Sequence, residues 1–200
     1  MIHQVLNQTG AYGTEPPSAW VKRWSHLVKP QGSVLDVACG QGRHAYYFHQ
    51  LNRRLTVVDR AQAAIDSIAI EANLCEKVVA DIENGPWPFE GRCFDAVVVT
   101  RYLWRPLLPT LLASLAPGGL LIYETFAEGN ETVGKPSRPE FLLRPGELLD
   151  LCKDLRVVAF EDGFWIDLNG GNPQFVQRIA AVRALLPQLE PSGPVRYLLT

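Results

Sequence analysis

The sequence has little that would mark a metal-binding, disulfide-bonded or membrane protein. Its four cysteines show no Cys-x-x-Cys spacing and no histidine in ligand register, which argues against a zinc site. Free thiols are typical of a reducing compartment, so we expect a cytoplasmic protein. The first residues lack a basic start followed by an apolar run, so no signal peptide is indicated. The most apolar stretch, 102–123, contains three prolines and a Gly118-Gly119 pair, which exclude a membrane span.

The chain also lacks an excess of positive charge. It has 19 basic and 21 acidic side chains and a formal net charge of −2, so the overall charge does not indicate a nucleic-acid partner. The overall charge does not exclude a local cluster of basic residues. Two hundred residues, 47% of them hydrophobic, are enough for one core. We expect a single domain over 1–200, with an N-terminal lid or arm in 1–16, a long loop at 126–144 and a tail at 186–200. The oligomeric state stays open.

Short apolar runs alternate with helical segments through most of the chain. Helices are expected at 19–28, 43–50, 61–72, 106–115 and 146–153. Strands are expected at 33–38, 54–59, 77–81, 94–100 and 119–125. Only turn residues separate two last runs, 155–161 and 175–183, so these should pair antiparallel. The pattern predicts an α/β, Rossmann-like three-layer αβα sandwich, with a mostly parallel seven-stranded sheet and a C-terminal antiparallel hairpin.

Three aspartates lie at or near the ends of successive predicted strands. Asp36 precedes a glycine turn, Gly40-Gln41-Gly42, which brings the backbone close to a ligand. Asp59 lies 23 residues after Asp36, where a carboxylate can accept both hydroxyls of a ribose. Asp81 ends the third strand, where the crevice outside the sheet passes an adenine. Each feature alone is common, but together they indicate an adenosine-containing ligand.

The turn Gly40-Gln41-Gly42-Arg43-His44-Ala45 also satisfies the glycine pattern of nicotinamide-binding folds. Three features argue against that ligand. Asp36 would repel a pyrophosphate but attract the ammonium group of S-adenosylmethionine. The terminal hairpin does not suit a doubly wound dehydrogenase, and the length leaves little room for a separate catalytic domain.

Residues 17–183 resemble class I S-adenosylmethionine-dependent methyltransferases. The resemblance implies S-adenosylmethionine as cofactor, S-adenosylhomocysteine as product, and these cofactor-binding residues: Asp36, Ala38, Gly40, Gln41, Gly42, Asp59, Arg60, Asp81, Ile82 and Thr100. Ala38 departs from the family pattern because it stands at the first glycine position, which we interpret as a small change in turn packing. Within the class, 123–149 and 177–181 resemble bacterial tellurite-resistance-type methyltransferases.

The acceptor is expected at the carboxyl ends of the fourth and fifth strands. Its candidate wall residues are Tyr12, Arg101, Tyr102, Glu124, Phe126 and Arg138. Methyl transfer mainly requires alignment and exclusion of water, so no metal is expected and no catalytic residue is assigned. Loops as long as 126–144 are usually functional, and this loop and the segment around Tyr12 are predicted to form a mobile cover.

Three functions remain open at this point. Compact size and acidic balance favour a methyltransferase that acts on a small molecule. An RNA or protein methyltransferase is the first alternative, although Thr100-Arg101-Tyr102-Leu103 stands where amide- and adenine-modifying branches carry Asn-Pro-Pro-Tyr or Asp-Pro-Pro-Tyr. The second alternative is a non-catalytic module that binds the cofactor and works through a partner.

Overall fold

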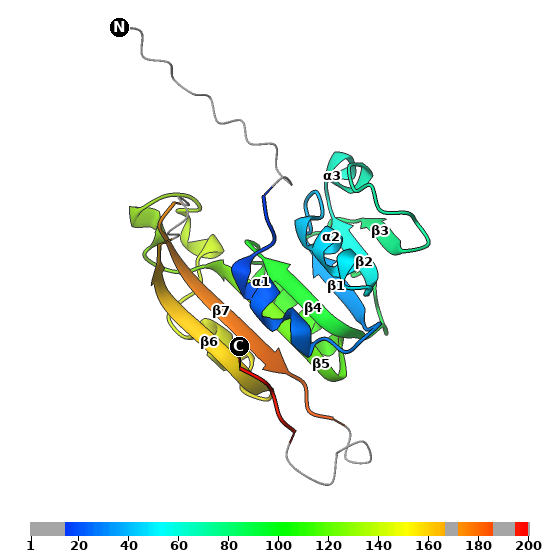
Figure 1. The fold of residues 1–200 in the computed structure, drawn as a ribbon. Helices are drawn as coiled ribbons and strands as arrows, with labels where there is room; N and C mark the ends of the chain where they lie inside the picture. Colours follow the sequence, from blue (N-terminus) through cyan, green and yellow to red (C-terminus); the bar gives the residue numbers. More distant parts are fainter. Residues whose placement is uncertain (1–14, 167–171, 186–194, 200) are drawn as a thin grey trace, which may run out of the picture.

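The structure is a computed structural model, and it describes residues 15–166, 172–185 and 195–199. One seven-stranded sheet runs in the order β3-β2-β1-β4-β5-β7-β6 (Figure 1). Its strands are β1 (Ser33–Val37), β2 (Arg54–Asp59), β3 (Cys75–Val79), β4 (Phe94–Thr100), β5 (Leu115–Phe126), β6 (Arg156–Trp165) and β7 (Gln174–Val182). The first five pair parallel, and β7 pairs antiparallel with both β5 and β6. The predicted sheet and its terminal hairpin are confirmed.

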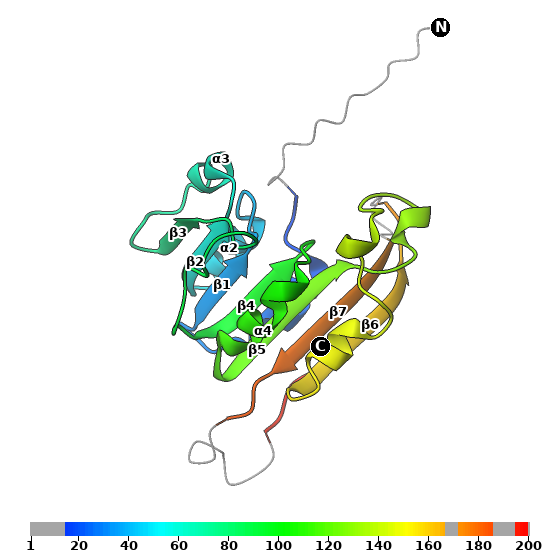
Figure 2. The ribbon, with the colours of Figure 1, turned by 180° about the vertical axis from the view of Figure 1, so that it is seen from behind.

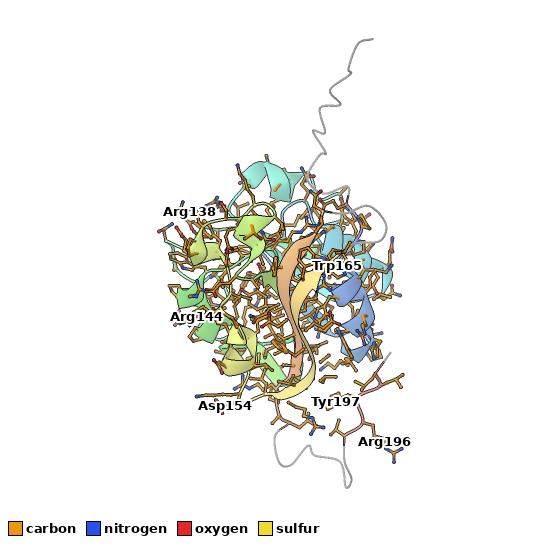
Figure 3. All side chains as sticks on the ribbon, turned by 90° about the vertical axis from the view of Figure 1, so that its left-hand side faces the viewer. Arg138, Arg144, Asp154, Trp165, Arg196 and Tyr197 are labelled. Carbon is orange, nitrogen blue, oxygen red and sulfur yellow. The ribbon has the colours of Figure 1, made fainter. Side chains whose placement is uncertain are left out.

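Helices cover both faces of the sheet (Figures 1–3). One face carries α1 (Ala19–Trp24), η1 (Ser25–Leu27), α2 (Arg43–Gln50) and α3 (Gln62–Asp66). The other carries η2 (Arg105–Leu107), α4 (Leu108–Ala113) and α5 (Glu147–Leu151), with η3 (Asn130–Thr132) and η4 (Pro139–Phe141) between β5 and α5. Alternate strand residues divide between two cores: Val57 packs toward α1 and α2, whereas Val58 packs toward α4 and α5. None of the helices in the described part of the chain has the length and apolar character to cross a membrane.

The first helix begins where the sequence predicts. Ser18 caps α1, because its hydroxyl oxygen accepts hydrogen bonds from the backbone N–H groups of Trp20 and Val21. Trp20 and Trp24 are buried, with ring centroids 5.6 Å apart in an edge-to-face arrangement. The helix is thereby fixed against the sheet, and its N-terminal end lies beside the carboxyl end of β5.

The predicted helix over 61–72 is wrong in its length, because α3 ends at Asp66. Tertiary hydrogen bonds replace the helical ones beyond that point. The backbone N–H of Ala69 donates to the Tyr46 hydroxyl at 2.6 Å, and the Lys77 ammonium donates to the carbonyl oxygen of Ile68 at 2.5 Å. Ile68 and Ile70 are still buried, as their apolar character requires, although they lie beyond the end of the helix.

The predicted third strand is shifted. β3 spans Cys75–Val79, so Asp81 lies in the turn after the strand instead of at its end. Asp81 accepts backbone hydrogen bonds from Glu83 and Asn84, the local pairing that favours turns for this residue type. The connection from β3 to β4 contains no helix, and Phe89, which is 1% exposed, packs its ring edge-to-face against Phe94.

Candidate active site

The polar residues predicted from the strand ends gather at one edge of the sheet. Asp36 pairs with Val98 in the ladder of β1 and β4, and Thr100 pairs with Glu124 in that of β4 and β5. Asp36, Thr100 and Glu124 therefore project from the face that α1 and α2 cover, near the carboxyl ends of three adjacent strands. In an open parallel sheet, this edge is where ligands bind.

The glycine turn after β1 keeps its backbone accessible. Gly40 and Gly42 have φ of 55° and 79°, in the left-handed region that favours glycine. The left-handed φ of Gly42 strains any other residue, and a Cβ atom there would also lie 2.9 Å from the end of the Ile68 side chain, whereas a Cβ on Gly40 would meet open space. Ala38 also has a left-handed φ, 52°. The residue in the first glycine position therefore has the backbone conformation of a glycine, at some cost in strain.

Asp36 is the most unusual ionisable group of the site. It is 2% exposed, and within the described residues its Oδ2 has no hydrogen-bond partner. Burial raises the pKa of the Asp36 carboxyl to about 7, Arg43 lowers it, and Asp59 raises it further. A buried carboxylate oxygen without a hydrogen-bond partner is costly, so this side chain suits a cationic ligand at the same place.

A cavity of about 130 Å³ opens next to the turn. Its lining residues are Ala38, Asp59, Arg60, Asp81, Ile82, Glu83 and Tyr102. Five of these seven are predicted cofactor-binding residues. Asp59 Oδ2 accepts the backbone N–H of Gly40 at 2.9 Å, and Oδ1 accepts that of Ala61 at 2.9 Å. Asp59 thus joins the glycine turn to the end of β2 and faces the same cavity.

Glu83 is a cavity residue that the sequence reasoning missed. Its only signal was its position, two residues after Asp81. Tyr102 was expected in the acceptor wall, but the structure places it in this cavity with Glu83. Burial first, and the charge of Glu83 second, raise the pKa of the Tyr102 phenol. Its backbone carbonyl accepts the hydroxyl of Tyr123 at 2.9 Å, which fixes the turn after β4.

The expected acceptor wall divides into two ion-pair groups. Glu124 accepts the Ser18 hydroxyl at 2.7 Å and pairs with Arg178 of β7 at 2.6 Å. The Arg178 guanidinium lies 4.7 Å from the ring centroid of Trp165, a cation–π contact at the end of β6. Arg101 forms the second group, in which it pairs with Glu15 at 2.6 Å. Sequence reasoning identified Glu124 and Arg101 but not their partners, which come from distant segments.

The other predicted acceptor residues are not brought together. Phe126 is half-buried at the end of β5, two residues beyond Glu124 on the same face. Arg138 is exposed, pairs with Glu140 and lies 5.2 Å from the Phe141 ring centroid, so it belongs to its own loop (Figure 3). Tyr12 lies outside the described residues, as does most of the predicted arm at 1–16.

His44 follows the turn and is 1% exposed. Its Nε2 accepts the backbone N–H of Ser18 at 3.2 Å. Burial first, and then the charges of Arg43 and Arg101, lower the pKa of His44 to about 3. The imidazole is therefore neutral at physiological pH, and it connects α2 to the cap of α1.

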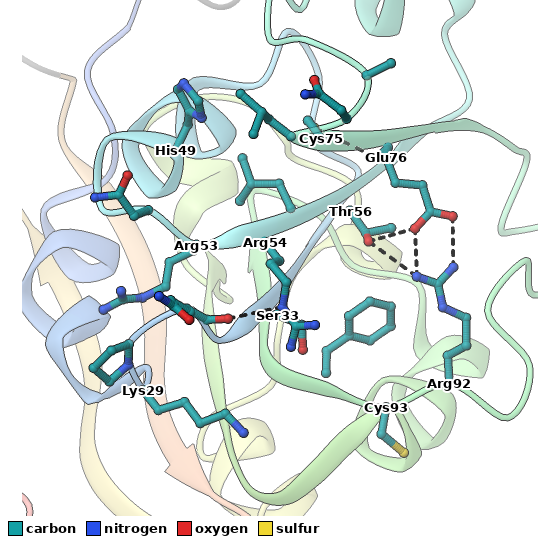
Figure 4. Close-up of a pocket in the computed structure, with 18 residues that line it drawn as sticks. Lys29, Ser33, His49, Arg53, Arg54, Thr56, Cys75, Glu76, Arg92 and Cys93 are labelled. Atoms are coloured by element: carbon teal, nitrogen blue, oxygen red, sulfur yellow. Dashed lines mark hydrogen bonds and ion pairs between the residues drawn. The ribbon is translucent and has the colours of Figure 1, made fainter.

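A second, larger depression of about 1200 Å³ lies elsewhere (Figure 4). Ser33, Arg54, Cys75 and Phe94 line it, and these are the first residues of β1, β2, β3 and β4. It therefore opens at the amino ends of the strands, away from the cavity that holds Asp59 and Asp81. None of the predicted site residues that the structure describes lines it.

Comparison with known proteins gives the class. Residues 34–119, from β1 into β5, match the family described as a methyltransferase domain. A malonyl-[acyl-carrier protein] O-methyltransferase of Serratia marcescens is 30% identical over 107 residues, which cover 50% of this chain and 41% of that protein. A protein-L-isoaspartate O-methyltransferase of Trichlorobacter lovleyi is 35% identical over 108 residues, 50% of this chain and 47% of that protein. Each match thus spans less than half of the relative's length.

Solved structures share the fold over a longer range. TehB from Haemophilus influenzae superposes with a TM-score of 0.71 at 21% identity, covering 86% of this chain and 64% of that chain. The glycopeptide N-methyltransferase MtfA in complex with S-adenosylhomocysteine gives a TM-score of 0.59 at 15% identity, covering 85% and 91%. The matched domain and the shared fold confirm the predicted resemblance to class I S-adenosylmethionine-dependent methyltransferases. At 21% identity the likeness to TehB shows a shared fold, so the resemblance to tellurite-resistance-type methyltransferases stays a prediction.

Proposed function

We propose that this protein transfers the methyl group of S-adenosylmethionine to a small-molecule acceptor. The single observation that carries the proposal is the buried Asp36 carboxylate beside the glycine turn, next to the cavity that Asp59 and Asp81 line. A carboxylate in that position suits the ammonium group of the cofactor and disfavours a pyrophosphate. A nicotinamide dinucleotide would therefore bind poorly at the same turn.

The residues of the site would bind the cofactor and would not react with it. Asp59 would accept the ribose hydroxyls, and Asp81 with Ile82 would contact the adenine edge. Gly40 offers backbone that no side chain covers. When bound, the cofactor supplies a methyl carbon activated by its sulfonium group, so the protein has to align the acceptor and exclude water. Arg101, Glu124 and Phe126, near the carboxyl ends of β4 and β5, would contact the acceptor.

Two observations bear on the acceptor. Both curated relatives are named as O-methyltransferases, which favours an oxygen atom. The near-neutral charge balance favours a small molecule over a nucleic acid. The relatives are also named for protein-borne acceptors, which keeps a protein substrate as the second candidate. A cytoplasmic location is part of the proposal, because three of the four free cysteines are buried thiols.

Two measurements test the proposal. Calorimetry should show micromolar binding of S-adenosylhomocysteine and no binding of NAD, and the reverse result would refute the cofactor assignment. Labelled methyl groups from S-adenosylmethionine should then enter the metabolite fraction of a cell extract. Label in the RNA or protein fraction would indicate the alternative acceptors, and binding without any transfer would indicate a non-catalytic module.

A further inference from the structure

Two arginines converge on one carboxylate at the edge of the cofactor crevice. Arg43 is the first residue of α2, directly after the glycine turn, and Arg101 directly follows β4. The Nη1 atom of Arg43 lies 2.9 Å from Glu15 Oε2, and that of Arg101 lies 2.6 Å from the same oxygen. Residues far apart in sequence thus share a single anion beside Asp36 and Thr100.

The two arginines are positioned before any ligand binds. The Arg43 side chain is only 14% exposed, and its Nη2 lies 3.4 Å from the Thr100 hydroxyl. Burial first, and the charge of Arg101 second, lower the pKa of Arg43, so the two cations repel each other unless an anion lies between them. Arg101 has a φ of 54°, and its backbone N–H donates to the carbonyl oxygen of Glu124 at 2.9 Å. Non-glycine residues in this strained conformation concentrate at ligand sites.

Glu15 is held much less firmly than the arginines it joins. Its side chain is 52% exposed, and exposed ion pairs contribute little to stability because water screens them. A carboxylate on a ligand that is anchored by other contacts in the crevice would therefore compete well with it. The Glu15 carboxylate is a local substitute for such a group, since it already satisfies both guanidinium groups.

We propose that Arg43 and Arg101 form a carboxylate-binding pair, which Glu15 occupies until a ligand carboxylate replaces it. The inference rests on the proposed function, because it assumes that ligands enter the crevice beside the glycine turn. The ligand carboxylate has two sources, the methionine part of the cofactor or the acceptor. Arg43 and Arg101 would in either case fix the orientation of the ligand by charge-assisted hydrogen bonds.

Calorimetry on three variants separates these sources. Arg101→Met removes one guanidinium, Glu15→Gln removes the competing charge, and Arg156→Met at an exposed position of β6 is the matched control. The first ligands are S-adenosylhomocysteine and methylthioadenosine, which carries the same nucleoside without the amino-acid carboxylate. Acetate, succinate and benzoate are then titrated into the protein, both free and loaded with S-adenosylhomocysteine. Melting curves confirm that each variant is folded.

For a cofactor carboxylate, Arg101→Met should weaken S-adenosylhomocysteine binding by about tenfold or more and leave methylthioadenosine unchanged. Glu15→Gln should tighten it by about two- to fivefold. For an acceptor carboxylate, the same two changes should appear only with the small carboxylates. Unchanged affinities for every ligand in both variants would overturn the proposal. If the wild type binds neither nucleoside, the proposed function fails, and the carboxylate titrations of the free protein still decide whether the pair is a site.

Discussion

Replacement of Asp36 by asparagine should stabilise the ligand-free protein and weaken cofactor binding. The carboxyl is 2% exposed, and its pKa is raised from 3.8 to about 7, chiefly by burial. Each pKa unit corresponds to about 1.4 kcal/mol, so the ionised side chain costs the folded protein up to about 4 kcal/mol. Asparagine has nearly the same shape and no charge, and it avoids most of that cost.

The sign of the effect depends on pH. Because the folded-state pKa lies above the unfolded value, the protonated Asp36 contributes stability that is complete below pH 4. That contribution is lost as the pH rises toward 7. The wild type and Asp36→Asn should therefore unfold at similar urea concentrations near pH 4. The difference in unfolding free energy should grow between pH 4 and 7 and stay constant above pH 7.

Urea unfolding at several pH values measures this difference, with Asp154→Asn at an exposed position as the control. Binding of S-adenosylhomocysteine at pH 8 should be weaker in Asp36→Asn, because the charge that faces the ligand ammonium is lost. A variant that is less stable than the wild type at pH 8, by the same amount as at pH 5, would refute the reasoning. It would mean that Asp36 has a stabilising partner in the folded protein.

Three further predictions concern the surroundings of this residue. Asp59→Ala should weaken S-adenosylhomocysteine binding at least about tenfold, as measured by calorimetry. It should also lower the unfolding free energy in urea by about 1–3 kcal/mol, because two backbone N–H groups lose their acceptor. An unchanged dissociation constant would show that Asp59 does not face the ligand. Glu147→Gln should lower the unfolding free energy by a similar amount, about 1–3 kcal/mol, because Glu147 accepts hydrogen bonds from Arg105 and the Arg144 backbone. The affinity for S-adenosylhomocysteine should not change, since these contacts lie away from the crevice, and a loss of affinity would contradict this placement. Segment 126–144 stays a predicted cover of the acceptor pocket, so binding of S-adenosylhomocysteine should slow its amide hydrogen exchange. If the glycine turn becomes protected while exchange in the segment is unchanged, the segment does not have that role.

Much of the fold follows from local patterns. Continuous apolar runs of the right length predicted β2 and β4 to the residue, and Ser18 predicted the start of α1 because its hydroxyl caps the helix. Position relative to the strands also predicted five of the seven residues that line the cavity beside the glycine turn, because the carboxyl ends of parallel strands meet at one edge.

Errors arose where side-chain hydrogen bonds outweighed the pattern of apolar residues. The helix expected over 61–72 ends at Asp66, since the Tyr46 hydroxyl and the Lys77 ammonium take over hydrogen bonds that a longer helix would have made. The strand before Asp81 ends two residues early, because the Asp81 carboxylate pairs with backbone groups of its own turn. Neither competitor is visible in a local pattern of apolar residues.

The sequence by itself determined the order of the strands, the glycine turn and the acids at or near the ends of three strands. Those features depend on residues close in the chain, whose conformational preferences act locally. Only the tertiary structure decided which distant charges meet. Glu15 forms ion pairs with Arg43 and Arg101, and Arg178 forms one with Glu124. These residues lie too far apart in the sequence for any local spacing pattern to predict the contacts. The burial that perturbs Asp36 likewise exists only once both helical layers cover the sheet, because desolvation is a property of the packed molecule.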